Sequence, residues 1–183
     1  MPTDALANPL VLPILGLLVE QPRHAYAVFD ELRARYAYLR VRNATVYTLL
    51  NTLSDVEWIT SVPLAAGDRR QYRLTESGSR VLAERVEHDI RETGLADEAA
   101  FMTALAYLGI LSPRVAADAL EARAERVRGE VARLDAALSG GEVSELHMIE
   151  AHYFLDRLQH DLAWLKATIR RIRSGALAWP KQN

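Results

Sequence analysis

The chain has 183 residues, 50% of them hydrophobic and 25% charged, so it is long and apolar enough to close a folded core. Its 22 basic and 24 acidic side chains leave a formal net charge of -2, which excludes a strong overall field for nucleic acid or anionic lipid. Any contact with a polyanion must therefore be local. The chain has no cysteine, which excludes thiolate metal sites, disulfide frameworks and cysteine nucleophiles.

The longest apolar stretch near the amino terminus, from Leu10 to Val19, is interrupted by Pro13 and Gly16 and is about half as long as a membrane-crossing helix. The segment before it has no basic residue, so it lacks the charged first region of a signal peptide. We therefore expect a cytoplasmic protein with no membrane contact.

Two helices are predicted at the start of the chain. Asn8 and Pro9 favour a helix over 10–20, because an asparagine oxygen can cap it and proline fits its first position. Pro22 ends that helix. A second helix is predicted over 24–37, since its apolar residues recur at the spacing of one buried face: Ala25, Val28, Phe29 and Leu32.

A third helix is predicted to begin at Asn43 as its cap, with an apolar stripe of Val46, Leu49, Leu50 and Leu53. Its opposite face is polar but scarcely charged, and it offers short donors and acceptors that can reach base edges or phosphates: Asn43, Thr45, Thr48 and Asn51. Tyr47 has two possible roles, because its ring can pack on the core while its hydroxyl reaches a phosphate.

The pattern then changes to a two-stranded hairpin. Ile59–Leu64 is rich in β-branched residues, a glycine turn follows, and Arg70–Thr75 alternates apolar and polar side chains. Thr75 is placed to cap a further helix, whose apolar spacing continues through 79–93. Three helices followed by a hairpin indicate a winged helix-turn-helix, in which one helix enters the major groove.

Basic residues lie where such a fold would meet DNA. The segment between Leu32 and Ser54 contains no acidic residue and carries four arginines: Arg33, Arg35, Arg40 and Arg42. Two more arginines, Arg69 and Arg70, stand at the tip of the hairpin. Each of these is also an ordinary solvated surface residue when taken alone. Their combination with a polar helix predicts phosphate contacts.

Only helices are predicted from Gly94 onward, so the expected fold is mainly α, with domains over 1–93 and 94–183. Ser112 and Pro113 begin a long helix, Gly140 and Gly141 make a bend, and a second long helix keeps heptad spacing from Met148 to Ile172. We therefore expect the two long helices to form an antiparallel pair. Its uncovered apolar edge predicts a second copy as partner, with dimerisation through Leu155, Leu158, Leu162, Trp164, Leu165 and Ile169.

The first half resembles the PadR family of transcriptional regulators in three places, which together span Leu10 to about Val86. These are the opening helix and its turn (Leu15, Gly16, Leu17, Leu18, Gln21, Pro22, His24, Tyr26), the recognition helix (Thr45, Val46, Tyr47, Leu49, Leu50, Leu53, Ile59), and the wing with its following helix (Arg70, Tyr72, Arg73, Leu74, Thr75, Gly78). The chain departs from the family at Ala25, Thr48 and Glu57, where glycine, proline and glycine are usual.

The resemblance implies a homodimeric DNA-binding regulator, commonly a repressor, on a roughly palindromic operator. Its two recognition helices must then stand about 34 Å apart. The DNA-binding residues that we predict are Tyr26, Arg40, Arg42, Asn43, Thr45, Tyr47, Thr48, Asn51, Arg69 and Arg70. Some family members respond to small aromatic or drug-like molecules, for which Phe101, Tyr107, Phe154 and Trp164 are candidate pocket residues, although ordinary core is the alternative.

Two rival functions stay open. An enzyme needs a reactive cluster, and the one candidate is His152, Asp156 and His160, whose spacing suits a metal but which lie away from the heptad seam. We therefore expect no enzyme, metal or cofactor. The other rival is a winged-helix module that binds protein instead of DNA, which the net charge of -2 favours slightly.

Overall fold

The computed structural model describes residues 5–63, 70–140 and 144–180. Its contacts divide them into two compact units. The first contains the described residues up to Asp89 together with Asp97–Leu108, and the second contains Ile90–Ala96 with the described residues from Gly109 onward. The segment 97–108 thus belongs with the first unit, whereas the domain boundary predicted from the sequence assigns it to the second.

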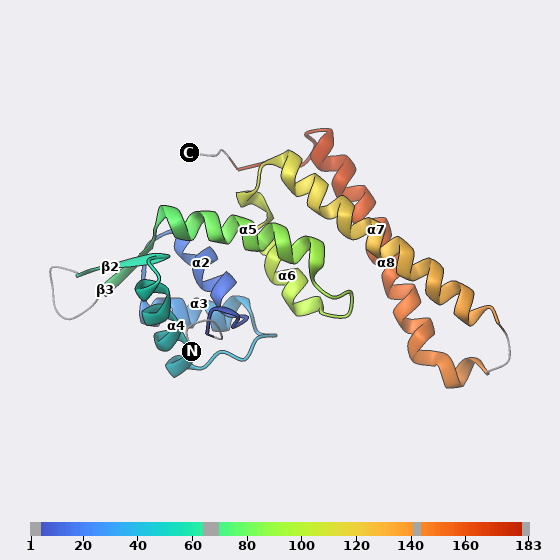
Figure 1. Cartoon of the computed structure of the whole chain (residues 1–183), viewed down its shortest axis with the longest axis horizontal. Helices are drawn as coiled ribbons and strands as arrows, with labels where there is room; N and C mark the ends of the chain where they lie inside the picture. Colours follow the sequence, from blue (N-terminus) through green and yellow to red (C-terminus); the bar gives the residue numbers. More distant parts are fainter. Residues whose placement is uncertain (1–4, 64–69, 141–143, 181–183) are drawn as a thin grey trace. The chain divides into compact units, whose positions relative to one another are not determined.

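Three helices form the core of the first unit: α2 (Val11–Glu20), α3 (Ala25–Arg35) and α4 (Asn43–Asp55) (Figure 1). Helix α2 is buried along almost its whole length, from Val11 to Leu18. Helices α3 and α4 bury the predicted stripes, with Val28, Leu32, Leu50 and Leu53 fully inaccessible. A hydrophobic helix enclosed by two amphipathic ones is the arrangement that their apolar spacing requires.

A small antiparallel sheet flanks these helices. Its strands are β1 (Arg23–His24), β2 (Ile59–Pro63) and β3 (Arg70–Leu74), in the order β1-β3-β2. The predicted hairpin is confirmed, with Ile59 opposite Leu74 and Ser61 opposite Tyr72. The third strand was not predicted, because two residues are too short to show an alternating pattern. The first unit is thus a winged helix with a three-stranded sheet.

The turn after α4 fixes the approach to β2. The amide of Trp58 donates to the Leu53 carbonyl and the amide of Glu57 donates to the Ser54 carbonyl, each at 3.0 Å, which is the Schellman pattern of helix ends. This pattern requires a left-handed residue, and Glu57 adopts it with φ of 59°. Gly78 packs on the same turn, since a Cβ there would lie 1.9 Å from the Trp58 carbonyl oxygen.

Helix α5 (Glu76–Glu92) begins three residues before the predicted start, with Thr75 as the expected cap: its Oγ1 accepts from the Gly78 amide at 3.0 Å. Helix α6 (Glu98–Ala106) is capped by the side chain of Asp97. The predicted cap at Asn43 is wrong. The carbonyl of Arg42 accepts the first helical bond of α4, so Arg42 is the N-cap and Asn43 is already helical.

The second unit is a pair of long antiparallel helices, α7 (Pro113–Leu138) and α8 (Ile149–Arg173) (Figure 1). The short 3-10 helix η1 (Leu108–Ile110) precedes α7, and η2 (Glu145–Met148) precedes α8. The predicted cap of α7 is confirmed, because the Ser112 side chain accepts from the Val115 amide. The seam between the helices buries Leu120, Val127, Leu134, Leu155, Leu158, Leu165, Ile169 and Ile172.

Arginines of this helix pair bind carbonyls at the carboxyl end of α5 and just after it. Arg123 is buried and donates to the Thr93 carbonyl at 3.1 Å, and Arg126 and Arg157 reach the carbonyls of Arg91 and Leu95. Burial, and then the nearby Arg126, lower the pKa of Arg123 to about 10. Cations at a helix carboxyl end are stabilising, and these contacts place Ile90–Ala96 in the second unit.

Candidate nucleic-acid interface

Helix α4 separates an apolar face from a polar one. Val46, Leu49, Leu50 and Leu53 are at most 2% exposed, whereas the opposite face is open to solvent along the helix: Asn43, Ala44, Tyr47, Thr48 and Asn51. Tyr47 is 44% exposed, and Thr45 is half-buried at the edge of this face. The predicted hydrogen-bonding face is therefore accessible to a ligand.

The side chains on this face differ in what they can still donate. The Thr48 hydroxyl donates to the Ala44 carbonyl at 3.0 Å, and Thr52 donates in the same way to Thr48. A threonine bonded like this keeps acceptor lone pairs and a methyl group for a base edge. No described residue hydrogen-bonds the side-chain amide of Asn43 or Asn51, so both amides can donate and accept outward.

Arg40 and Arg42 stand at the amino end of this face. Both are exposed, and neither forms an ion pair with any described acid. Arg42 is the N-cap of α4 and directly precedes Asn43, the first residue of the helix. Two unpaired cations beside an uncharged hydrogen-bonding face can hold a phosphate backbone while the face reads bases.

The four arginines between Leu32 and Ser54, which the sequence predicts as a positive strip, are not all free in the structure. Arg35 is neutralised, because its guanidinium contacts Glu20 at 2.6 Å and Glu31 at 2.7 Å. Glu20 lies 15 residues before Arg35 in the sequence, and Glu31 lies one helical turn before it on α3. Arg33 is exposed, with its guanidinium carbon 5.5 Å from the centre of the Phe29 ring. The strip therefore has fewer free charges than the sequence suggests.

The wing supplies further cations. Arg70 is exposed at the start of β3, opposite Pro63. Arg73 is exposed on the same strand. It is not among the DNA-binding residues predicted from the sequence, although a strand that buries Tyr72 must turn Arg73 to the opposite, exposed side. Arg69 lies outside the described residues.

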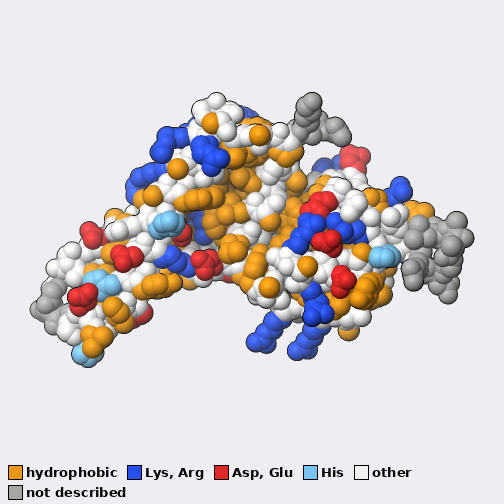
Figure 2. All heavy atoms as spheres, turned by 180° about the vertical axis from the view of Figure 1, so that it is seen from behind, with side chains coloured by type: hydrophobic (Ala, Val, Ile, Leu, Met, Phe, Trp, Pro, Cys, Tyr) orange, Lys and Arg blue, Asp and Glu red, His pale blue; other side chains and the backbone are white. Residues whose placement is uncertain are grey.

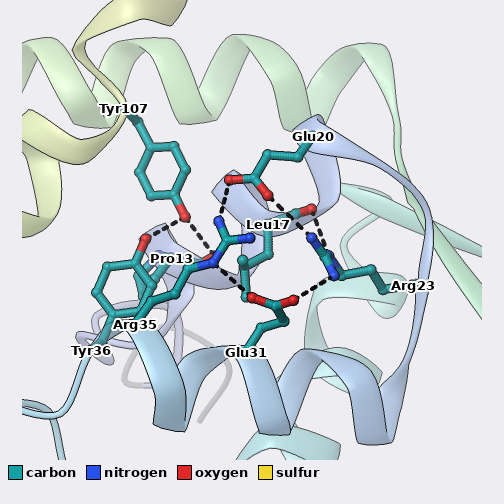
Figure 3. Close-up of polar contacts among 8 residues, drawn as sticks. All are labelled: Pro13, Leu17, Glu20, Arg23, Glu31, Arg35, Tyr36 and Tyr107. Carbon is teal, nitrogen blue, oxygen red and sulfur yellow. Dashed lines mark hydrogen bonds and ion pairs between the residues drawn. The ribbon is translucent and has the colours of Figure 1, made fainter.

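An ion-pair network holds α3 against α2 (Figure 3). Arg23, which is 9% exposed, donates to the Leu17 carbonyl and contacts Glu20 at 3.1 Å and Glu31 at 3.2 Å. Arg35 bonds the same two carboxylates from the other side, and the hydrogen bond with Glu20 raises its pKa above the ordinary value. Two arginines alternate with two glutamates, so α2, β1 and α3 are fixed as one body.

A tyrosine pair fixes the segment that leads to α4. The Tyr36 and Tyr107 hydroxyls lie 2.5 Å apart, and Tyr107 reaches the Pro13 carbonyl at 3.5 Å (Figure 3). The Tyr107 ring covers Gly16, where a Cβ would lie 2.1 Å from a ring carbon. Gly16 is therefore required for α6 to approach α2. The Tyr38 hydroxyl adds a contact to Thr103 of α6 at 3.1 Å.

The model of the transcriptional regulator PadR-like family matches residues 14–84, which run from α2 into α5. This segment is a PadR-like domain. It contains every residue that we predicted to bind DNA.

Solved structures resemble the chain over most of its length. Bacillus subtilis PadR in complex with operator DNA is 21% identical, with 90% of this chain and 99% of that chain covered and a TM-score of 0.42. The same protein in complex with p-coumaric acid is 19% identical, at 91% and 99% coverage and a TM-score of 0.41. The Vibrio cholerae virulence activator AphA is 20% identical, at 89% and 94% coverage and a TM-score of 0.38. A search among curated sequences gives no significant match.

Within the PadR-like domain, most of the predicted DNA-binding residues follow one another from Arg40 to Asn51, on α4 and the turn before it. Tyr26 comes from a different element, the first turn of α3, where it is 59% exposed and its ring lies 6.3 Å from that of Phe29. Arg70 comes from the wing. A DNA-binding role for each of them stays a prediction.

The residues predicted for dimerisation divide into two groups. Leu158 and Leu165 are at most 1% exposed inside one chain, and Leu155 and Ile169 are also buried in the seam with α7. Leu162 is half-buried and Trp164 is 43% exposed. The buried residues can therefore affect a dimer only by holding α7 and α8 together, whereas Trp164 can contact a second copy directly.

The predicted effector residues are divided between the units. Tyr107 is buried in the first unit against Gly16, and Phe101 is half-buried on α6. In the second unit Phe154 is half-buried beneath the Arg157 guanidinium, whose carbon lies 5.0 Å from the ring centre, and Trp164 is exposed. The core position of Tyr107 gives it a structural role, and a pocket shared by all four residues stays a prediction.

The candidate metal ligands do not converge. His152 is half-buried, Asp156 and His160 are exposed, and no group of three or more His, Asp or Glu side chains could hold a metal in the part of the chain that the structure describes. Acidic, histidine and hydrophobic side chains are intermixed on the surface of α7 and α8 that Figure 2 shows. No described helix is long and apolar enough to cross a bilayer.

Proposed function

We propose that this chain is a sequence-specific DNA-binding transcriptional regulator. The observation that carries the proposal is the outer face of α4, an exposed row of uncharged hydrogen-bonding side chains with the unpaired Arg40 and Arg42 at its amino end. A helix of this kind in a winged fold lies in the major groove, where amides and hydroxyls can distinguish base pairs. The match to a family of transcriptional regulators supports the same function.

We further propose that the chain acts as a homodimer on a roughly palindromic operator, as a repressor that a small-molecule effector releases. A twofold dimer would present two copies of α4 about 34 Å apart, one helical turn of DNA. The exposed aromatic residues of α8, Tyr153 and Trp164, support a partner surface on the second unit. A DNA ligand also fits the cytoplasmic location predicted from the sequence.

Binding of the full chain to a labelled duplex from upstream of its own gene tests the proposal, with a shuffled duplex as control. Arg40, Arg42 and Arg70 from two copies supply about six phosphate contacts, so affinity for both duplexes should fall about a thousandfold between 50 and 200 mM salt. The upstream duplex should bind more tightly at either salt concentration.

Binding that is independent of salt and without preference between the duplexes would overturn the DNA proposal. That result would favour the rival function, a winged-helix module that binds protein, which is compatible with the net charge of -2.

A further inference from the structure

A cavity of about 560 Å³ opens within the first unit. Its wall is made by the start of α2, the segment between α3 and α4, helix α5 and the start of α6. Leu12, Leu39 and Ala100 give the wall an apolar part. The volume lies in the range of sites for small organic molecules, which are mostly apolar with a few polar groups.

The polar part of the wall contains two carboxylates, Asp89 on α5 and Asp97 before α6. Asp89 is half-buried, and no described residue donates a hydrogen bond to it or forms an ion pair with it. Burial raises its pKa, as does the neighbouring Asp97, while His88 and Arg85 lower it. A half-buried carboxylate that receives no hydrogen bond or ion pair from the protein is available to a ligand cation.

The cationic residues of the wall form no ion pair with Asp89. Arg85 lies one turn before it on α5, but the Arg85 guanidinium carbon is 5.3 Å from the centre of the Trp58 ring and makes no ion pair with a described acid. His88 is exposed to solvent. Asp97 uses one oxygen to accept from the Ala100 amide at 3.1 Å, so its second oxygen remains available.

We infer that this cavity binds a small organic cation with an apolar body, for example an arylalkyl ammonium ion whose charge lies against Asp89. The apolar wall takes the ring system and the two carboxylates take the ammonium group. An organic anion of the same shape is disfavoured, because its charge would be repelled by Asp89 and Asp97.

The cavity also adjoins the segment that carries the unpaired arginines. Leu39 in its wall lies between Tyr38, which is bonded to Thr103 of α6, and Arg40. A ligand that displaces Leu39 therefore moves the turn that precedes α4. The regulatory part of this inference, that the cation changes DNA affinity, rests on the proposed function, whereas cation binding itself does not.

The test is calorimetric titration of the full chain, without DNA, with 2-naphthylmethylammonium and with 2-naphthylacetate, which share a ring and differ in charge. We expect the cation to bind at least tenfold more tightly than the anion. Asp89→Asn should lower the affinity for the cation about tenfold, which is the effect of losing one charged hydrogen bond. Asp97→Asn should weaken it less and keep the helix cap, because asparagine caps as well as aspartate.

Glu84→Gln, which removes an exposed carboxylate of α5 outside the cavity wall, is the matched control and should leave cation affinity unchanged. Circular dichroism of each variant excludes unfolding as the cause, and we expect Asp89→Asn to be as stable as the parent because it removes a half-buried charge. Equal affinity for the two naphthyl ligands, or equal affinity of parent and Asp89→Asn, overturns the inference.

The regulatory part has its own readout. We expect saturating cation to change affinity for the upstream duplex at least threefold in the parent and not in Asp89→Asn. Cation binding with unchanged DNA affinity would show that the coupling is wrong and the ligand site right. If the chain binds no DNA at all, the proposed function fails while the calorimetric result still decides the ligand site.

Discussion

Glu57 has the one left-handed backbone among the non-glycine residues that the structure describes, and it lies at the turn that aims β2. The two Schellman hydrogen bonds after α4 hold it there, and the Thr75 hydroxyl donates to its carbonyl at 2.7 Å. A side chain with a Cβ is costly in this conformation, by about 1–2 kcal/mol. The chain accepts this strain at a position where the PadR family usually has glycine.

Glu57→Gly should therefore stabilise the protein. Relief of the left-handed strain, partly offset by the greater entropy of glycine in the unfolded chain, predicts a gain of about 0.5–1 kcal/mol in the free energy of unfolding. Urea denaturation measures it. Glu84→Gly, at an exposed position inside α5, is the control and should lose about 1 kcal/mol. A loss at both positions would show that the turn is not strained.

The raised pKa of Tyr107 makes the stability of the fold depend on pH. Burial raises its pKa above the ordinary value of 10.0, and burial also raises the pKa of Tyr36. The folded state thus keeps protons that the unfolded chain releases above pH 10, so this stabilisation is complete below pH 10 and declines as the pH rises further. Each tyrosine contributes a loss of up to about 1.4 kcal/mol per pH unit in that range.

Tyr107→Phe should lose about 1 kcal/mol at pH 7, because the Tyr36 hydroxyl loses its partner, and its stability should fall less steeply than that of the parent above pH 10. Urea denaturation at several pH values between 7 and 11 measures both effects. Tyr153→Phe, at a side chain that is 70% exposed, should leave the pH profile unchanged. Equal slopes for the parent and Tyr107→Phe would contradict the account.

At the scale of elements, α4 and the turn before it combine two roles that mutations should separate. Arg40→Ala and Arg42→Ala should each weaken binding to every DNA sequence alike and reduce the salt slope by about 0.9 per phosphate contact, or about twice that in a dimer. Arg114→Ala, at an exposed position of α7, is the control. A change in sequence preference, with an unchanged salt slope, would contradict a phosphate role for either arginine.

The elements that the sequence predicts well are those with a strong apolar period. The buried stripe of α4 was predicted residue by residue, and so was the cap at Ser112. The stripes of α3 and α8 were predicted except that Phe29 and Leu162 are half-buried. What was missed depends on contacts between elements. The two-residue β1 has no period of its own and exists because Arg23 and His24 pair with β3. Asn43 is a good cap by residue type, but the Arg42 carbonyl takes that place.

The candidate site was predictable to a similar extent. The polar face of α4 follows from its helical period. The charge around it does not, because Glu20 lies 15 residues before Arg35 and neutralises it only in the folded chain. The cavity beside Asp89 joins segments that are distant in the sequence, so no local pattern indicates it.

At the scale of the whole molecule, the α7–α8 hairpin is the part on which a dimer depends. Leu158→Asp places a charge at a position that is fully buried in the seam, so it should cost several kcal/mol and separate the copies or unfold the hairpin. Light scattering and circular dichroism measure the two effects. Gln159→Asp changes the exposed neighbour and should have neither effect. A stable, dimeric Leu158→Asp variant would show that the seam is not where the structure has it.

The central claim is that the outer face of α4 reads bases, and the most direct measurement compares Asn43→Ala, Thr48→Ala and Asn51→Ala with the parent on the upstream duplex and on the shuffled one. We expect at least one of these variants to lose about 1–3 kcal/mol of binding free energy on the upstream duplex and almost none on the shuffled duplex, since each removes a base contact and no charge. Equal losses on both duplexes in all three variants, or no loss on either, would contradict it.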